Sequence, residues 1–191
     1  MILKKPTWLH KPISVDNLEA IQEEMLPILY REIPNFDTAE PTFCFVLRPK
    51  IEKFAPLYTK FLESFGLLNR WHYSAFITTN GDHKFSIHVD SLEWKTRSYG
   101  LNLPLINCDG TYTVFYDAEI ETKPEYDANN PVNSARLIKK DTTGTEIFRF
   151  PASQPAWVNT TIPHAPVSTH TKPRAIISAR FNPEVHELFN K

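Results

Sequence analysis

The sequence predicts an α+β chain in which an antiparallel β sandwich or barrel follows two helices. Apolar residues recur at three- and four-residue steps near the beginning of the chain, and the period changes to two from Trp71 onward. The 16 prolines against 5 glycines, with 13% aromatic residues, favour strands and rigid loops over long helices. A length of 191 residues with 41% hydrophobic side chains suits one domain with its own core.

The first helix is expected after Ser14, which is a plausible N-cap. Its apolar stripe is formed by Leu18, Ile21, Met25 and Leu29. Pro27 is expected to bend or end this helix, because proline lacks the N–H that a helix interior requires.

The second helix is expected to end at Gly66, a residue type well placed as a C-terminal cap. Its apolar positions are Ile51, Phe54, Tyr58, Phe61, Leu62 and Phe65. Together the two helices predict a supporting layer for the strands that follow.

Eight short strands are expected in the remainder of the chain, and Asn80-Gly81 is a strong signal for the turn between the first two. The strands are Tyr73–Thr79, Phe85–Asp90, Ser98–Ile106, Thr111–Tyr116, Ala135–Lys140, Thr145–Phe150, Ala156–Thr160 and Arg174–Phe181. The polar stretch Asp117–Ser134 is expected to form a flap or mobile loop. Within the sandwich and barrel class, the jelly roll is the preferred architecture.

Charge and cysteine content limit the classes of function. The 21 basic and 22 acidic residues supply no overall field for nucleic acid or an acidic membrane. Cys44 and Cys108 are too few for a disulfide framework and fit no zinc-ligand spacing, and the N-terminal sequence lacks the apolar run of a secretory signal. A reduced, cytoplasmic protein is therefore expected, with no membrane partner. Nucleic acid is an unlikely partner.

A histidine and an aspartate share one face of a predicted strand. Alternation along Phe85–Asp90 places Ser86, His88 and Asp90 together, with the apolar residues on the opposite face. With a distant second histidine, His88 and Asp90 would complete the two-His, one-carboxylate set that holds ferrous iron and leaves three positions open.

His164 is the candidate for that second histidine. It lies 74 residues after Asp90, and Pro163 and Pro166 restrict the backbone around it. A restricted backbone suits a fixed ligand better than a mobile surface side chain. The candidate metal ligands are therefore His88, Asp90 and His164.

Arg174 follows ten residues later and opens the last predicted strand. Alternation places it on one face with Ile176, Ser178 and Arg180. A guanidinium is a planar fork that matches a carboxylate, so an arginine beside a ferrous site suits a dicarboxylate co-substrate. Arg174, Ser178 and Arg180 are the candidate co-substrate contacts, while a rim salt bridge for Arg180 and an ordinary strand hydroxyl for Ser178 remain open.

Over about 110 residues the chain resembles the Fe(II)/2-oxoglutarate-dependent oxygenases. The resemblance extends from Trp71 to Phe181 and includes the motif His88-Val89-Asp90, the strand Tyr99-Gly100-Leu101-Asn102-Leu103, the strand segment Asp109-Gly110-Thr111-Tyr112-Thr113-Val114-Phe115-Tyr116, Pro163-His164 and Arg174-Ala175-Ile176-Ile177-Ser178. The two central segments are most similar to the prolyl-hydroxylase branch, although Gly100 stands where many of those enzymes have a tyrosine. Arg180 is similar in position to a second arginine of the AlkB-like demethylases.

The resemblance implies a double-stranded β-helix in which His88, Asp90 and His164 hold iron and Arg174 binds the distal carboxylate of 2-oxoglutarate. It implies hydroxylation of a substrate C–H bond by O2, with release of succinate and CO2 and with ascorbate as a reductant. The substrate would be a peptidyl side chain such as proline, or a small metabolite, and nucleic acid ranks third. The corresponding domain organisation is one oxygenase domain over 1–191, with a helical support region at 1–70, a β-helix core at 71–181 and a tail at 182–191.

Two other classes of function use the same residues. A cupin-like module could bind a metal or a small ligand without catalysis, and two histidines with an aspartate also suit a hydrolytic zinc site. Arg174 favours the oxygenase, because neither alternative requires a carboxylate receptor ten residues after the last ligand.

Overall fold

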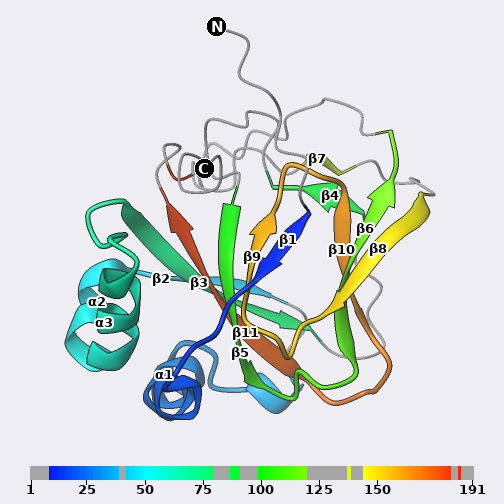
Figure 1. Ribbon diagram of the computed structural model, residues 1–191. Coiled ribbons are helices and arrows are strands. Elements are labelled where there is room, and N and C mark those ends of the chain that lie inside the picture. The colour runs from blue at the N-terminus through cyan, green and yellow to red at the C-terminus, as the bar shows by residue number, and fades with distance from the viewer. Residues whose placement is uncertain are drawn as a thin grey trace, which may run out of the picture.

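The computed structural model describes residues 9–38, 42–79, 87–90, 99–119, 137–138, 144–181 and 185. Two antiparallel sheets face each other, and three α-helices lie outside one of them (Figure 1). This arrangement confirms the expected jelly roll, or double-stranded β-helix. Among the described residues, none of the helices has the length and apolar character that a membrane crossing requires.

The larger sheet has six strands in the order β1-β9-β5-β11-β3-β2. These are β1 (His10–Pro12), β9 (Ala156–Asn159), β5 (Tyr99–Ile106), β11 (Arg174–Phe181), β3 (Trp71–Thr79) and β2 (Phe43–Val46). The smaller sheet has five strands in the order β7-β4-β10-β6-β8. These are β7 (Leu137–Ile138), β4 (His88–Val89), β10 (His164–Ser168), β6 (Thr111–Asp117) and β8 (Thr145–Pro151).

Three α-helices support the larger sheet, where the sequence pattern predicted two. They are α1 (Leu18–Glu32), α2 (Arg48–Phe54) and α3 (Pro56–Ser64), and a short 3-10 turn spans Phe36–Thr38. The predicted second helix is divided at Ala55, because Pro56 restricts the residue before it and serves as the first residue of α3. Pro27 does not end α1, which continues to Glu32, since Pro27 lies on the solvent-exposed side and Ile28 and Leu29 after it are buried.

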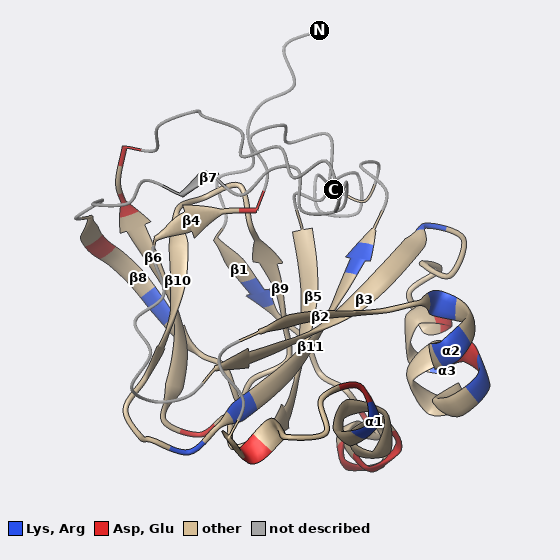
Figure 2. Cartoon of the chain, turned by 180° about the vertical axis from the view of Figure 1, so that it is seen from behind, with Lys and Arg blue, Asp and Glu red and all other residues tan. Residues whose placement is uncertain are grey.

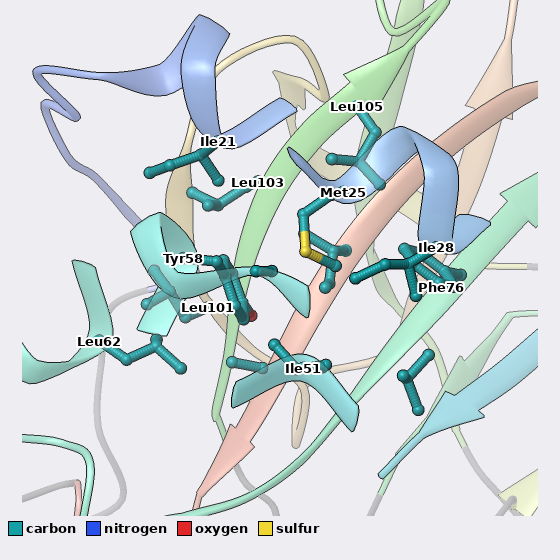
Figure 3. Packing of buried hydrophobic residues seen from close by; sticks show 14 of the residues in the cluster. Ile21, Met25, Ile28, Ile51, Tyr58, Leu62, Phe76, Leu101, Leu103 and Leu105 are labelled. Carbon is teal, nitrogen blue, oxygen red and sulfur yellow. The ribbon is translucent and has the colours of Figure 1, made fainter. Parts of the chain in front are cut away.

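The main core lies between the helices and the outer face of the larger sheet (Figure 3). Ile21, Met25 and Ile28 of α1 pack there with Tyr58 and Leu62 of α3. The sheet contributes the alternate residues Phe76 of β3, Leu101, Leu103 and Leu105 of β5, and Ala175, Ile177, Ala179 and Phe181 of β11. The opposite residues of β5 and β11 therefore face the space between the two sheets.

A smaller apolar cluster fills part of that inner space. It contains Phe115, Phe150, Ala156 and Val158. The ring of His10, on the edge strand β1, stacks on Phe148 and Phe150 of the edge strand β8. The two sheets are thus in contact at this end of the sandwich.

Three strands were absent from the sequence-based expectation. β1 and β2 bring residues of the N-terminal 70 into the larger sheet, so this region is not helical alone. The third is β10, which contains Pro166. β4 pairs with β10 only at His164, so one side of β10 needs no ladder partner there and Pro166 is tolerated.

Several expected features lie outside the described residues. These are the Asn80-Gly81 turn, the start of the Phe85–Asp90 strand, the polar stretch beyond residue 119 and, except for Val185, the tail at 182–191. Charged positions among the described residues lie mainly on the helices and at strand ends (Figure 2).

Candidate metal centre

His88, Asp90 and His164 are brought together by the smaller sheet. β4 carries His88 and ends just before Asp90, and β10 places His164 directly opposite His88 in the strand register. The Asp90 backbone N–H also donates to the Thr160 carbonyl, 2.9 Å away, which holds the end of β4 against the turn that precedes β10. Residues 74 positions apart in the chain thus become neighbours.

The distances between these side chains suit a shared cation. Asp90 Oδ1 lies 3.5 Å from His88 Nε2 and 3.9 Å from His164 Nε2. One ligand atom from each of the three residues lies within 4.8 Å of the others. Neighbouring ligands of a common transition metal are about 3 Å apart when metal–ligand bonds are about 2.1 Å long. The donors are therefore close to ligating positions, and they form the only such group among the described residues.

The protonation of His164 also suits a metal ligand. Its Nδ1 lies 2.8 Å from the Ile162 carbonyl oxygen, which selects the tautomer with the proton on Nδ1 and leaves the Nε2 lone pair free. Burial and the neighbouring His88 lower the pKa of His164 to about 4. The imidazole is therefore neutral at physiological pH, as a metal ligand must be.

Asp90 is held as a carboxylate. Burial acts to raise its pKa, but the Arg180 charge and a hydrogen bond from His88 hold the pKa of this carboxyl well below its usual range. Arg180 Nη2 lies 2.8 Å from Asp90 Oδ2. One oxygen of Asp90 therefore pairs with arginine while the other faces the two histidines.

Arg180 links the two sheets through this ion pair. It lies on β11 of the larger sheet, is 4% exposed, and its Nη1 also lies 3.4 Å from Thr160 Oγ1. Of the two interpretations left open for Arg180, the structure places it in an ion pair, although that pair is buried and involves a candidate metal ligand.

Arg174 is buried deeper on the inner face of β11. Only 2% of its surface is exposed, and its Nε donates to Thr79 Oγ1 at 2.9 Å. Among the described residues, its Nη1 has no hydrogen-bond partner, and no carboxylate forms an ion pair with it. Burial lowers the pKa of Arg174, and the neighbouring Cys108 opposes this shift. A buried cation with an unused donor is costly unless an anion completes its surroundings.

A second group of unused polar atoms lies near Arg180. Ser178 Oγ and Asn102 Oδ1 are both buried, and neither has a hydrogen-bond partner in the part of the chain that the structure describes. The two residues are paired in the register of β11 and β5. At Gly100 an added Cβ would lie 3.0 Å from Arg180 Nη1, 3.0 Å from Ser178 Oγ and 3.1 Å from Asn102 Oδ1. The glycine therefore lets these polar atoms approach the backbone of β5 more closely than a Cβ would allow.

Sequence reasoning found six residues of this site, and the structure adds three more. All three candidate ligands meet in one cluster, and Arg174, Ser178 and Arg180 lie on the predicted common face of β11. Thr79, Thr160 and Asn102 were not selected, although Thr79 ends a predicted strand and Asn102 alternates with buried leucines. Their roles depend on strand register, which a single sequence does not specify.

The fold and the three-residue cluster define a double-stranded β-helix with a candidate two-His, one-carboxylate centre. No protein-family model matches the sequence. No curated protein matches it either.

Solved structures share the fold. The crystal structure of the epimerase SnoN, in complex with Fe3+, alpha ketoglutarate and nogalamycin RO, is similar to this chain with a TM-score of 0.51 and 12% identity, over 95% of this chain and 84% of that chain. HygX from Streptomyces hygroscopicus, with nickel and 2-oxoglutarate bound, has a TM-score of 0.49 and 7% identity over 92% of this chain and 82% of that chain. The SnoN comparison supports the double-stranded β-helix architecture.

Proposed function

We propose that this protein is an Fe(II)- and 2-oxoglutarate-dependent oxygenase that hydroxylates a C–H bond of its substrate. The observation that carries the proposal is the pairing of two features on facing sheets. One is the His88, Asp90 and His164 cluster, and the other is the buried, incompletely paired Arg174. A metal-binding module or a zinc hydrolase would explain the first feature and leave the second without a purpose.

The ligand residues fit iron in charge and in protonation. His164 is a neutral nitrogen donor with its Nδ1 proton engaged, and Asp90 supplies one negative charge whose second oxygen is already held by Arg180. Such a set leaves positions for further ligands on one side of a ferrous ion. His88, Asp90 and His164 would therefore hold the metal.

The inner face of β11 fits a keto diacid. Arg174 would receive the distal carboxylate through its unused Nη1, while Thr79 keeps the guanidinium in place. Ser178 and Asn102, next to Arg180, would contribute polar contacts nearer to the metal. The co-substrate would thereby satisfy buried groups that the protein alone leaves unsatisfied.

When bound, iron and 2-oxoglutarate together supply the oxidation: O2, 2-oxoglutarate and a substrate C–H yield the hydroxylated substrate, succinate and CO2. The protein's own residues bind, orient and exclude water. Arg180 positions the Asp90 carboxylate, and the apolar residues of the inner cluster, including Phe115, limit solvent around His164.

The family resemblance bears on the class of substrate. The resemblance to prolyl hydroxylases favours a peptidyl side chain such as proline, and a small metabolite is the alternative.

Cys44 and Cys108 are free thiols, which supports a cytoplasmic location for the enzyme.

The proposal is tested by incubating the purified protein with Fe(II), ascorbate, 2-oxoglutarate and O2, and measuring succinate. We expect metal-dependent succinate formation that is lost when the metal is chelated. Iron binding without any succinate would instead indicate a non-catalytic binding module. Hydrolytic activity restricted to the zinc form would indicate a zinc hydrolase.

A further inference from the structure

One short turn contacts two of the three candidate metal ligands. Residues 160–163 join β9 of the larger sheet to β10 of the smaller sheet, so the turn crosses from one layer to the other (Figure 1). Its Thr160 carbonyl accepts from the Asp90 backbone N–H at 2.9 Å. Further along, the Ile162 carbonyl oxygen lies 2.8 Å from His164 Nδ1. The conformation of this turn therefore affects the positions of both ligands.

The turn also contacts the arginine that pairs with Asp90. Thr160 Oγ1 lies 3.4 Å from Arg180 Nη1, and Arg180 Nη2 lies 2.8 Å from Asp90 Oδ2. Thr160 thus acts on the surroundings of Asp90 twice, through its carbonyl and through its hydroxyl. A change in its backbone would disturb both contacts.

Asn159 fixes the backbone at this point. Its Oδ1 accepts from the Thr161 backbone N–H at 3.1 Å and from Thr161 Oγ1 at 2.7 Å. Because the backbone N–H can only donate, the atom facing it must be the amide oxygen. A side-chain oxygen bound to the N–H two residues later forms an Asx turn, which closes the backbone around the residue between them.

Asn159 and Asp90 bind opposite sides of one peptide unit. The Thr160 carbonyl and the Thr161 N–H belong to the same planar group and point in opposite directions. Asn159 holds the N–H, and the Asp90 backbone binds the carbonyl. Tilting this peptide to weaken one hydrogen bond would weaken the other. The orientation that Asn159 imposes is therefore transmitted to Asp90.

Asn159 is itself held firmly in the sheet. The residue is fully buried, and its backbone N–H donates to the Leu9 carbonyl at 2.9 Å. On its other side it is paired with Tyr99 in the register of β9 and β5. A buried residue fixed by neighbours on both sides is suited to orient other groups precisely.

We propose that Asn159 is a positioning residue of the metal centre. Through the peptide between Thr160 and Thr161 it sets the position of Asp90, and through the same turn it places the carbonyl that holds His164. This inference rests on the proposed function, because it concerns residues that would hold the iron. The effect of Asn159 is exerted through these ligands.

The test compares Asn159→Ala with Asn159→Ser by titrating each purified protein with Co(II) alone. Serine differs from alanine by one oxygen that can accept from the Thr161 N–H in the same kind of turn, so the pair separates the hydrogen bond from the loss of size. Asn159→Ala should weaken the Co(II) affinity about tenfold, the lower end of the range for residues that act on a metal through its ligands. Asn159→Ser should recover about threefold of this loss, because serine forms such turns more weakly than asparagine.

Asn107→Ala is the matched control. Asn107 also holds a turn through its side chain, because its Nδ2 donates to the Pro173 carbonyl at 2.7 Å. Its replacement should lower stability and leave the Co(II) affinity unchanged. If urea denaturation shows that the Asn159 variants are poorly folded, Thr161→Val and Thr161→Ser replace them, since Thr161 is only partly buried and serine keeps the hydroxyl that valine removes.

Two spectra distinguish positioning from a loss of stability alone. The visible absorption bands of bound Co(II) report the ligand geometry, and nitrogen NMR of the metal-free protein reports which ring nitrogen of His164 carries the proton. Asn159→Ala should shift the Co(II) bands and mix the two tautomers of His164, and Asn159→Ser should restore both signals. A purely structural residue would move neither.

Three results would overturn the inference. The first is equal Co(II) affinity in Asn159→Ala and Asn159→Ser, or in Thr161→Val and Thr161→Ser where these replace them. The second is a His164 tautomer that does not respond to Asn159→Ala. The third is a loss of Co(II) affinity in Asn107→Ala as large as in Asn159→Ala.

These outcomes are separate from the fate of the proposed function. If the variants respond to Co(II) as expected while no succinate forms under any condition, the oxygenase proposal fails and the positioning role stands. If succinate forms with iron but the Asn159 variants bind Co(II) like the unmodified protein, the oxygenase proposal stands and the positioning role fails.

Discussion

Asp90 is the residue on which the contacts of the site converge. One carboxylate oxygen faces both histidines, and the other accepts from Arg180 of the opposite sheet. In the proposed function the residue would have two tasks, metal ligation and charge compensation for a buried guanidinium. Replacement of Asp90 by alanine would remove both at once. It would also destabilise the fold, because the buried charge of Arg180 would lose its partner.

Asp90→Asn separates the two tasks. The amide keeps the size of the side chain and can still accept from Arg180, but it removes the anionic metal ligand. We expect the affinity for Fe(II), measured by anaerobic titration, to fall by more than the roughly 10- to 100-fold typical of residues that contact a metal only through its ligands. Asp109→Asn, at an exposed position, is the control. Unchanged metal affinity would remove Asp90 from the ligand set.

Arg174→Leu should act in opposite directions on binding and stability. Loss of the charge-assisted contact should weaken 2-oxoglutarate binding by about 2 to 5 kcal/mol, measured by titration of the metal-loaded protein. The free energy of unfolding should stay the same or increase, because the variant removes a buried charge that has no ionic partner among the described residues. Arg174→Lys, which keeps the charge without the planar fork, should bind with intermediate affinity. An unchanged requirement for 2-oxoglutarate would reassign the arginine.

Helices α1 and α3 are joined by a side chain that caps a helix from outside. The Glu24 carboxylate of α1 accepts from the backbone N–H of Leu57, at 2.8 Å, and of Tyr58, at 3.2 Å. These N–H groups belong to the first turn of α3, where no partner exists within the helix and negative charge is favourable.

Glu24→Ala should therefore reduce the free energy of unfolding by about 0.5 to 2 kcal/mol, the usual effect of losing an N-terminal cap. Urea denaturation is the appropriate measurement. Glu23→Ala, one position earlier and exposed, should change stability by less than about 0.5 kcal/mol. Equal effects of the two variants would exclude a specific capping role.

The end of α1 and the middle of α2 are linked by Glu32 and Lys50, whose carboxylate oxygen and Nζ lie 2.6 Å apart. The hydrogen bond from Lys50 lowers the pKa of Glu32 in the folded protein. A carboxyl with a lowered folded-state pKa stabilises the fold above its ordinary pKa, and this contribution is lost as the pH falls through the folded-state value.

Glu32→Gln should accordingly lower the free energy of unfolding by about 0.2 to 1 kcal/mol at pH 7. The difference from the unmodified protein should begin to shrink as the pH falls below the ordinary carboxyl pKa of about 4.3. It should approach zero only below the lowered folded-state pKa of Glu32, where both proteins carry an uncharged side chain. Urea titrations across this pH range measure the effect, and the exposed Glu63→Gln serves as the control. A difference that persists undiminished at low pH would point to packing rather than charge.

Prolines have different effects on the helices and strands in which they lie. Pro56 follows Ala55 and starts α3, as a proline at the first helical position should, so the break between α2 and α3 was readable from the sequence. Pro27 is tolerated within α1 because the face toward the sheet remains apolar. Pro166 is tolerated in β10 because β4 pairs with that strand at His164 only. The last two cases depend on neighbours that local sequence does not reveal.

In the whole molecule, the proposed site joins the two sheets of the sandwich. His88, Asp90 and His164 belong to the smaller sheet and its connecting turn, whereas Arg174, Ser178 and Arg180 belong to the larger. Metal and co-substrate would therefore bridge the sheets only in the folded state, and such ligands stabilise a fold by mass action.

Saturating Fe(II) at about 100 times its dissociation constant should raise the free energy of unfolding by about 2.7 kcal/mol. Adding 2-oxoglutarate should raise it further. Thermal unfolding under anaerobic conditions measures both steps, with Asp90→Asn as the control that should respond to neither. A metal-independent response to 2-oxoglutarate would place its binding elsewhere.

The sequence alone determined the class of fold, the helical and strand faces and the identity of six candidate site residues, because these follow from residue type and periodicity. The tertiary structure decided which oxygen of Asp90 faces the histidines, that Arg180 pairs with this carboxylate and that Thr79 holds Arg174. Each of these depends on the register between strands distant in the chain. Register is a property of the packed sheets as a whole, and no local pattern encodes it.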